Sequence, residues 1–174
     1  LDGDRLMAIL ALDLQTRGRL RKNTVVATVM SNLGLEVMLR ERGISLVRAA
    51  VGDRYVVERM RAEGFNFGGE QSGHIVNLDC STTGDGLVTA LSVISILAER
   101  GVPLSRLRDC MTVYPQTLIN LRVRERRDLS GLAPVADAIR GAESVLGDRG
   151  RVLVRYSGTE LVARVMVEGE DEGT

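Results

Sequence analysis

The chain has 174 residues, of which 44% are hydrophobic and 26% charged, and its 23 basic residues balance its 23 acidic ones. This composition is typical of a soluble globular protein with one large or two small domains, and it differs from that of disordered chains. A net charge of zero creates no field that would attract a polyanion, so nucleic-acid binding is disfavoured. No apolar run reaches the roughly 18 residues that a membrane span requires, so we expect no membrane partner.

Cys80 and Cys110 are the only cysteines in the sequence. They lie in different expected elements without C-x-x-C spacing, which predicts neither a disulfide framework nor a structural zinc site. Free thiols are typical of a reducing compartment, so we expect a cytoplasmic protein. The sequence opens without a basic and apolar leader, although a signal could have been removed with a preceding part.

The first hundred residues alternate between helical and strand patterns. Helical spacing predicts an amphipathic helix over residues 4–17, with Asp4 as its cap, and a second helix that starts at Asn32. Further helices are expected at 53–62 and 87–100, and strands at 24–30, 44–49, 65–69 and 75–78. In the last helix, Leu91, Ile94 and Leu97 form an apolar stripe that we expect to face the core. This alternation predicts a three-layer α/β/α domain over residues 1–103.

The pattern changes after Gly101-Val102-Pro103, which is the best candidate for a linker. Beyond it, the sequence predicts a short helix at 104–110, a helix at 133–146, and strands at 117–124, 150–155 and 161–168. A strand-helix-strand-strand order predicts a small α+β domain with an antiparallel sheet over residues 104–174.

A first polar cluster, Gly-Glu-Gln-Ser-Gly-His, occupies residues 69–74. Glu70 and Ser72 stand two residues apart, so on an extended segment both side chains would project to one face and bond neighbouring sugar hydroxyls. A turn with an exposed glutamate fits this spacing equally well. His74 is the only histidine, and a lone histidine at the end of a strand is more often structural than catalytic.

A second cluster, Arg-Tyr-Ser-Gly-Thr-Glu, occupies residues 155–160. Ser157-Gly158-Thr159 predicts a tight turn between two strands, whose backbone N–H groups can converge on an anion. Arg155 precedes the turn and Arg164 follows it on the returning strand. Hydrogen bonds to charged groups contribute about 1.5–3 kcal/mol each, so several of them could hold a phosphate. A plain β-turn is the alternative, and the two arginines disfavour it.

The order Glu-Gln-Ser-Gly-His followed by Arg-Tyr-Ser-Gly-Thr-Glu resembles the α-D-phosphohexomutases, and residues 2–170 are most similar to the bacterial phosphoglucosamine mutases of that family. The resemblance implies the third and fourth domains of such an isomerase, the fourth lacking its final helix. This substrate-binding half would serve the interconversion of glucosamine 6-phosphate and glucosamine 1-phosphate, on the way to UDP-N-acetylglucosamine and peptidoglycan. Another hexose phosphomutase, acting on mannose or glucose phosphates, and a non-catalytic phosphosugar-binding module remain open alternatives.

The resemblance also implies roles for individual residues. The sugar is expected to contact Glu70, Ser72 and His74, and Arg54 in a Gly-Asp-Arg motif is expected near the substrate cleft. For Arg54 the alternative is a helix start with a surface ion pair. His74 is also a candidate for assisting proton transfer, and no other catalytic residue is expected in this chain. The expected phosphate-binding residues are Arg155, Ser157, Gly158, Thr159 and Arg164.

The family works through a phosphoserine and Mg²⁺, which the resemblance assigns to an N-terminal half without a counterpart here. Asp2-Gly3-Asp4-Arg5 is similar to the family's metal loop, but it lacks a third aspartate and runs into a helix, so we expect no metal site and no activity from this chain alone. The implied partners are a hexosamine phosphate and the N-terminal domains of the same enzyme, and a homodimer stays open. Leu161 stands where the family has proline, which predicts a less rigid phosphate loop.

Overall fold

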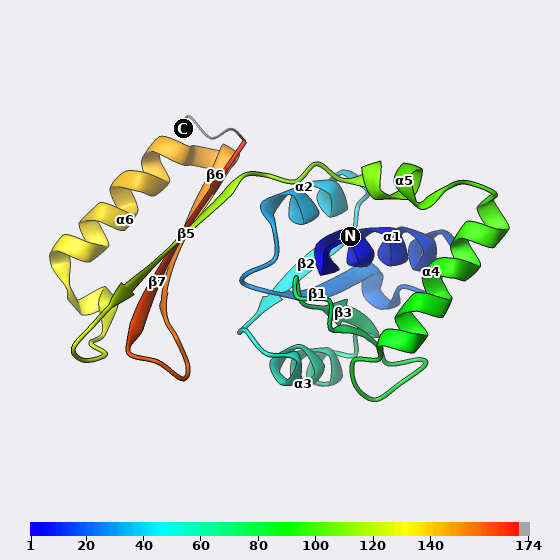
Figure 1. The fold of residues 1–174 in the computed structure, drawn as a ribbon, viewed down its shortest axis with the longest axis horizontal. Coiled ribbons are helices and arrows are strands. Elements are labelled where there is room, and N and C mark those ends of the chain that lie inside the picture. The colour runs from blue at the N-terminus through cyan, green and yellow to red at the C-terminus, as the bar shows by residue number, and fades with distance from the viewer. Residues whose placement is uncertain (171–174) are drawn as a thin grey trace. The chain divides into compact units, whose positions relative to one another are not determined.

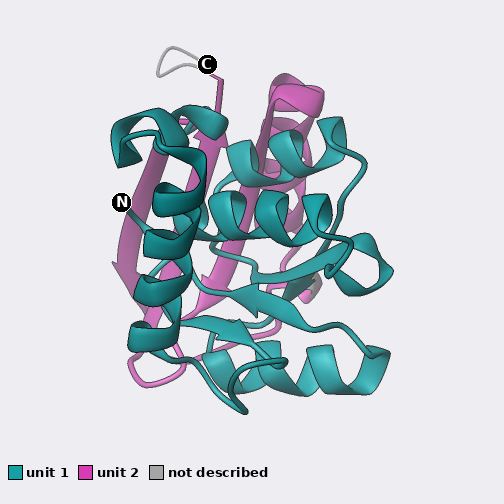
Figure 2. Ribbon diagram, turned by 90° about the vertical axis from the view of Figure 1, so that its right-hand side faces the viewer, with its two compact units in different colours: residues 1–113 teal, residues 114–174 magenta. Residues whose placement is uncertain are grey.

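The computed structural model describes residues 1–170 and divides into two compact units, Leu1–Val113 and Tyr114–Thr174 (Figures 1 and 2). This boundary lies beyond the one predicted after Pro103. Pro103 starts a short helix, α5 (Leu104–Leu107), instead of ending the domain. Leu107 and Cys110 then pack against the core of the first unit, which keeps these residues within it.

The first unit is an α/β unit built on one mixed sheet. Its strands are β1 (Thr24–Thr28), β2 (Ser45–Ala49), β3 (Phe67–Gly69) and β4 (Ile75–Asn77), in the order β2-β1-β3-β4. Strands β2 and β3 run parallel to β1, and β4 runs antiparallel to β3. Its longer helices are α1 (Gly3–Thr16), α2 (Leu33–Glu41), α3 (Asp53–Glu63) and α4 (Gly86–Arg100).

Helices cover both faces of this sheet (Figure 1). Val25 of β1 belongs to one buried cluster with residues of α1, α2 and α4, whereas Val26 belongs to a second cluster with Val56 and Met60 of α3. Successive strand residues point to opposite faces, and all five residues of β1 are buried, as expected for a strand between two helical layers. The predicted three-layer α/β/α architecture is thereby confirmed.

The face of α4 that packs on the core differs from the predicted one. Leu91 and Ile94 are 66% and 57% exposed, and of the predicted stripe only Leu97 packs against the core. Val93 and Ile96 are buried instead. Helix α4 carries apolar residues on two faces, so its periodicity alone does not identify the buried one.

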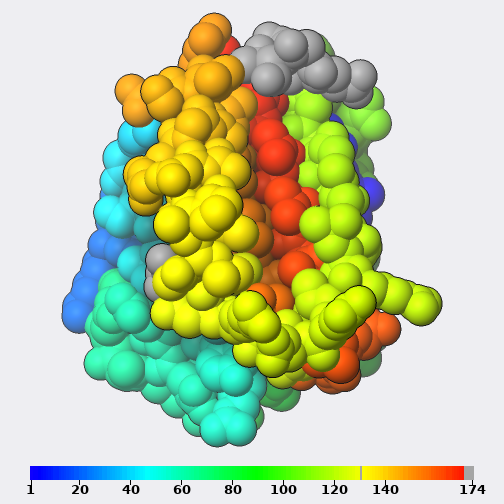
Figure 3. All heavy atoms as spheres, turned by 90° about the vertical axis from the view of Figure 1, so that its left-hand side faces the viewer, coloured from blue at the N-terminus to red at the C-terminus, as the bar shows by residue number. Residues whose placement is uncertain are grey.

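The second unit has an antiparallel sheet with one helix packed against it. Its elements are β5 (Gln116–Arg122), α6 (Ala133–Leu146), β6 (Gly150–Tyr156) and β7 (Val162–Gly169), and the strand order is β5-β7-β6. Both strand pairs are antiparallel, which confirms the predicted α+β fold. Figure 3 shows α6 in yellow and orange beside β7 in red and β5 in lime. An apolar cavity of about 530 Å³ lies between α6 and the sheet.

Within residues 1–170, no single helix is long and apolar enough to cross a membrane. Helix α4 and residues Leu104–Cys110 meet that length and composition only as a pair, bent by 100°.

The start of α1 is fixed by two aspartates with different roles. Asp2, and not Asp4 as predicted, is the N-cap, since its Oδ1 accepts the Arg5 N–H at 2.9 Å. Asp4 is fully buried, and its Oδ2 accepts the Asn32 N–H at 2.8 Å. Burial raises the pKa of Asp4 to about 6, although the bond from Asn32 and the charge of Arg48 act in the opposite direction. The carboxyl thus joins α1 to the loop between β1 and α2.

This burial predicts a pH-dependent stability. Because the pKa of Asp4 rises on folding from 3.8 to about 6, its contribution is fully present below about pH 4 and is lost as the pH rises through 6. At 1.36 kcal/mol per pKa unit, the loss is about 2–3 kcal/mol. Urea unfolding between pH 4 and 7 should show this decline in the wild type and not in Asp4→Asn. Asp109→Asn alters an exposed carboxylate and should follow the wild type; parallel curves for Asp4→Asn and wild type would contradict the assignment.

Gly3 brings the start of α1 into contact with the turn between β3 and β4. Its N–H donates to the Gln71 carbonyl at 2.9 Å. A Cβ atom at residue 3 would lie 2.0 Å from the Glu70 carbonyl oxygen and 2.8 Å from the Gly73 nitrogen, which are backbone atoms. Glycine is therefore required for this contact.

We predict that Gly3→Ala destabilises the chain by about 2 kcal/mol, within the range of about 1–3 kcal/mol typical of overpacking. Gly86→Ala is the matched control, because Gly86 also begins a helix and an added Cβ would meet no atom within 4 Å. Thermal or urea unfolding measures both variants. Equal stability of the two variants would show that the turn between β3 and β4 can move to accommodate the added Cβ without a measurable cost.

Candidate functional site

The first polar cluster forms the turn that joins β3 to β4. Gly73 N–H donates to the Glu70 carbonyl at 3.0 Å, and Glu70 N–H donates to the His74 carbonyl at 3.1 Å. The stretch is therefore a tight turn and not the extended segment predicted from the spacing of Glu70 and Ser72. Gly73 adopts a φ of +102°, which glycine adopts readily and side-chain-bearing residues rarely do.

The turn brings the three predicted sugar-binding side chains together at His74. The Ser72 Oγ lies 3.1 Å from His74 Nδ1, and the Glu70 Oε2 lies 3.4 Å from the same atom. The Glu70 side chain is only 12% exposed, whereas that of His74 is 64% exposed. The carboxylate is thus held in place by its surroundings, while the imidazole is open to solvent.

Glu70 is also held by a contact that was not predicted from the sequence. Its Oε1 accepts the Gly52 N–H at 3.0 Å, which ties the turn to the loop between β2 and α3. Gly52 has a φ of +128°, so the Gly-Asp-Arg motif contains a glycine for conformational reasons. Gly52 is the one feature of the local sequence that could have indicated its contact with Glu70, because the two residues are not related by any spacing pattern.

Arg54 lies in the first turn of α3, beside this loop. Its side chain is 80% exposed, and its Nε donates to Glu58 Oε1 at 2.7 Å on the same helix. The Glu58 carboxylate raises the pKa of Arg54. The structure therefore engages Arg54 in a surface ion pair, which was the alternative interpretation, and not with the Glu70 turn.

The two aspartates of the stretch similar to a metal loop have structural roles in this chain. Asp2 caps α1, and Asp4 is buried against Asn32 N–H. Among residues 1–170, no group of three His, Cys, Asp or Glu side chains is arranged to hold a metal ion.

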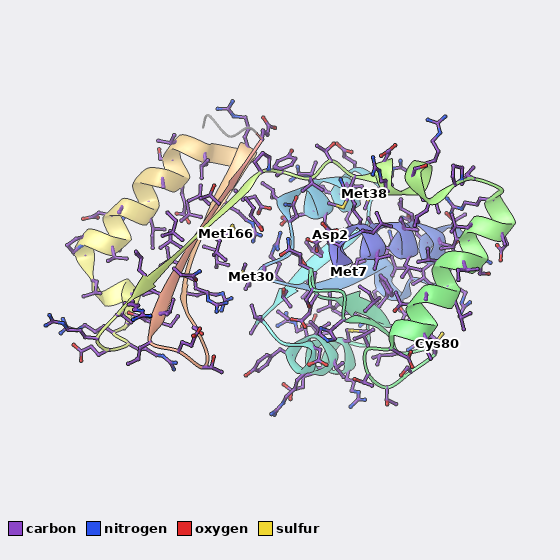
Figure 4. The ribbon with its side chains drawn as sticks, in the orientation of Figure 1. Asp2, Met7, Met30, Met38, Cys80 and Met166 are labelled. Atoms are coloured by element: carbon purple, nitrogen blue, oxygen red, sulfur yellow. The ribbon has the colours of Figure 1, made fainter. Side chains whose placement is uncertain are left out.

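The second polar cluster forms the loop that joins β6 to β7. Arg155 and Arg164 are cross-strand partners in the antiparallel register, so both guanidinium groups stand on one face of the sheet. Met166, labelled in Figure 4, lies on the same face of β7. Burial, and then the charge of Arg164, lower the pKa of Arg155.

These two arginines are incompletely satisfied. The Nε atoms of Arg155 and Arg164 are buried without a hydrogen-bond partner in the described part of the chain. The Arg164 Nη2 lies 3.7 Å from Glu160 Oε2, which is long for an ion pair. Two neighbouring positive charges with unused donors favour a bound anion.

The loop backbone adds further donors. Ser157 is buried, its N–H donates to the Val162 carbonyl at 2.8 Å, and its Oγ lies 3.4 Å from the Glu160 nitrogen. Within residues 1–170, the N–H groups of Gly158 and Thr159 donate to no protein acceptor, and both residues are exposed. A Cβ at Gly158 would meet no atom within 4 Å, so the space beside it is open. The loop thus combines two arginines with two unused N–H groups.

Comparison with known proteins agrees with this organisation. The model of the phosphoglucomutase/phosphomannomutase α/β/α domain III matches residues 2–114, and that of the phosphoglucomutase/phosphomannomutase C-terminal domain matches residues 118–174. The phosphoglucosamine mutases of Nitratidesulfovibrio vulgaris and Syntrophotalea carbinolica are 57% and 53% identical over 98% of this chain. The chain spans only 38% and 37% of the length of these two relatives.

Solved structures share the fold. The Aspergillus fumigatus N-acetylphosphoglucosamine mutase in complex with GlcNAc-6P and magnesium has a TM-score of 0.82 at 22% identity, covering 99% of this chain and 44% of that one. A phosphoglucomutase/phosphomannomutase family protein from Burkholderia thailandensis has a TM-score of 0.74 at 21% identity, covering 99% of this chain and 38% of that one. The chain therefore belongs to the phosphoglucomutase/phosphomannomutase family, the α-D-phosphohexomutases, and contains the α/β/α domain III and the C-terminal domain of that family.

Proposed function

We propose that the chain is the substrate-binding part of a phosphoglucosamine mutase, which interconverts glucosamine 6-phosphate and glucosamine 1-phosphate through a phosphoserine and a bisphosphate intermediate. Its identity of 52–57% to phosphoglucosamine mutases over 98% of its length supports this choice. The observation that carries the proposal is the pair Arg155 and Arg164 beside the unused N–H groups of the β6–β7 loop.

The β6–β7 loop would hold the phosphate that does not react. Two guanidinium groups on adjacent strands repel each other, and a dianion between them replaces this repulsion with attraction. The N–H groups of Gly158 and Thr159 would supply additional donors. A bisphosphate that turns over within the enzyme presents each phosphate in turn, so one such site serves both orientations.

The Glu70 turn would hold the sugar. The Glu70 carboxylate can accept hydrogen bonds from adjacent hydroxyls, and its negative charge also suits a protonated amino group on a glucosamine ring. Ser72 offers a hydroxyl to the same ligand. His74 is exposed and bonded to Ser72, so it would contact the ligand and could assist proton transfer. Arg54 would join the site only by leaving Glu58.

The reacting phosphoserine and Mg²⁺ would come from outside this chain. A relative's structure contains magnesium, yet the carboxylates near the start of α1 are engaged in capping and burial. Much of the rate of phosphoryl transfer comes from positioning and charge stabilisation, and positioning is the part assigned to this chain. The N-terminal domains of the same enzyme are thus its required partner.

The enzyme would act in the cytoplasm and supply a precursor of UDP-N-acetylglucosamine and peptidoglycan. The two free thiols, Cys80 and Cys110, support a reducing compartment.

A second candidate within the family is a phosphomannomutase or phosphoglucomutase, because the matching family models carry those names. A panel of glucosamine, mannose and glucose phosphates, assayed with the full-length enzyme, separates these candidates. We expect the highest kcat/KM with glucosamine phosphate.

Removing a phosphate-binding arginine should reduce catalysis. We predict that Arg155→Ala in the full-length enzyme lowers kcat/KM by at least about tenfold, the value of one lost hydrogen bond to a charged group. Arg140→Ala is the control, since Arg140 is exposed on α6 and forms an ion pair with Asp137 on the same helix. Steady-state kinetics measure both variants. An unchanged kcat/KM for Arg155→Ala would remove this arginine from the site.

The 174-residue chain should bind a phosphosugar without converting it. Calorimetry with glucosamine 6-phosphate should detect binding that Arg155→Ala weakens, and a coupled assay should detect no glucosamine 1-phosphate. Turnover by this chain alone would contradict the proposal that the phosphoserine and Mg²⁺ come from outside it. Binding by the full-length enzyme without turnover would favour the non-catalytic phosphosugar-binding module.

A further inference from the structure

The segment that joins β5 to α6 is hydrogen-bonded to the β6–β7 loop and to Tyr156, the last residue of β6. Val123 N–H donates to the Leu161 carbonyl at 3.0 Å, and Arg127 N–H donates to the Tyr156 hydroxyl at 3.2 Å. Between these, Arg126 Nη2 donates to two carbonyl oxygens of the loop, that of Gly158 at 3.0 Å and that of Glu160 at 3.2 Å.

The contact with Gly158 determines where the next N–H points. In a trans peptide group the C=O and the following N–H lie in one plane and point in opposite directions, and no cis peptide occurs among the described residues. The carbonyl of Gly158 and the N–H of Thr159 belong to the same peptide group. When Arg126 holds this carbonyl, the Thr159 N–H therefore points away from Arg126, and it is one of the two donors that the loop leaves unused.

Charge strengthens this arrangement. A guanidinium bound to a carbonyl oxygen polarises the peptide group and makes its N–H a stronger donor. In the described part of the chain, Arg126 forms no ion pair with a carboxylate, so its charge acts on the loop without compensation. Arg124 lies close by in sequence and is also exposed, but it makes none of these contacts.

We propose that Arg126 is a positioning residue of the anion site. It holds the carbonyls of Gly158 and Glu160 on the side of the loop that faces Arg126. The Thr159 N–H then points to the opposite side, where it would donate to the ligand. This inference rests on the proposed function of the loop as a phosphate site, and it adds a residue that lies outside both polar clusters.

The experiment compares three variants of the 174-residue chain with the wild type, using inorganic phosphate as the probe at constant ionic strength. NMR titration gives the apparent Kd and the shift of the Thr159 amide proton. We expect Arg126→Gln to weaken phosphate binding at least about fivefold and to reduce the downfield shift of the Thr159 amide at saturation. Arg126→Lys should recover part of both, because an ammonium group can also donate to these carbonyls.

Arg124→Gln is the charge-matched control, and we expect less than a twofold change in its Kd. Arg126→Gln that binds phosphate like the wild type, or that loses no more affinity than Arg124→Gln, overturns the proposal. Equal losses in the two variants would mean that net charge alone matters. Unchanged resonances of α6 in Arg126→Gln establish that the unit is folded, and Arg126→Lys provides the second test should they change.

A further variant separates this inference from the proposed function. If the wild type shows no saturable phosphate binding, or if Arg155→Ala binds as tightly as the wild type, the loop is not the proposed phosphate site and both ideas fail. If Arg155→Ala loses binding while Arg126→Gln retains it, the phosphate site stands and only the role of Arg126 is wrong.

Discussion

The feature on which the candidate phosphate site depends is the pairing of two like charges across adjacent strands. The same two strands carry, further along the same face, Arg151 opposite Glu168 with 2.6 Å between Nε and Oε2. Glu168 is buried in this pair and Arg151 partly so, and the two charges neutralise each other, as buried charges usually require. Arg155, in contrast, faces Arg164. The cross-strand pair Arg151–Glu168 is therefore neutralised, whereas the pair Arg155–Arg164 carries two positive charges. This second pair adjoins the loop with unused donors.

Both candidate sites lie at turns between antiparallel strands, one in each unit. Neither turn is held by its own residues alone, because each receives contacts from segments distant in sequence. The turn between β3 and β4 contacts Gly3 and Gly52, and the turn between β6 and β7 contacts Val123 and Arg126. Such support from outside a turn restricts its motion, so that its side chains and N–H groups keep one geometry before a ligand arrives.

Much of this organisation could be predicted from the sequence because the signals are local. The helix at 133–146 was predicted with the bounds that α6 has, since Pro134 lies in its first turn and Gly147 follows its end. Long-range contacts left no such signal. Neither the burial of Asp4 against Asn32 nor the contact of Arg126 with the β6–β7 loop is encoded in residue spacing. The packed face of α4 was predicted wrongly because apolar residues occur on two of its faces.

The unneutralised arginine pair has a consequence for how the protein behaves in different buffers. Dissolved ions screen charges over a Debye length of about 10 Å at 0.1 M salt, so they weaken the attraction of a ligand in solution more than the repulsion between Arg155 and Arg164, which are partly buried on adjacent strands. Inert salt should therefore lower the affinity for a phosphosugar while changing the stability of the unliganded second unit little. Sulfate or phosphate in the buffer acts differently, since a dianion that occupies the site between the arginines raises the melting temperature of the second unit by mass action.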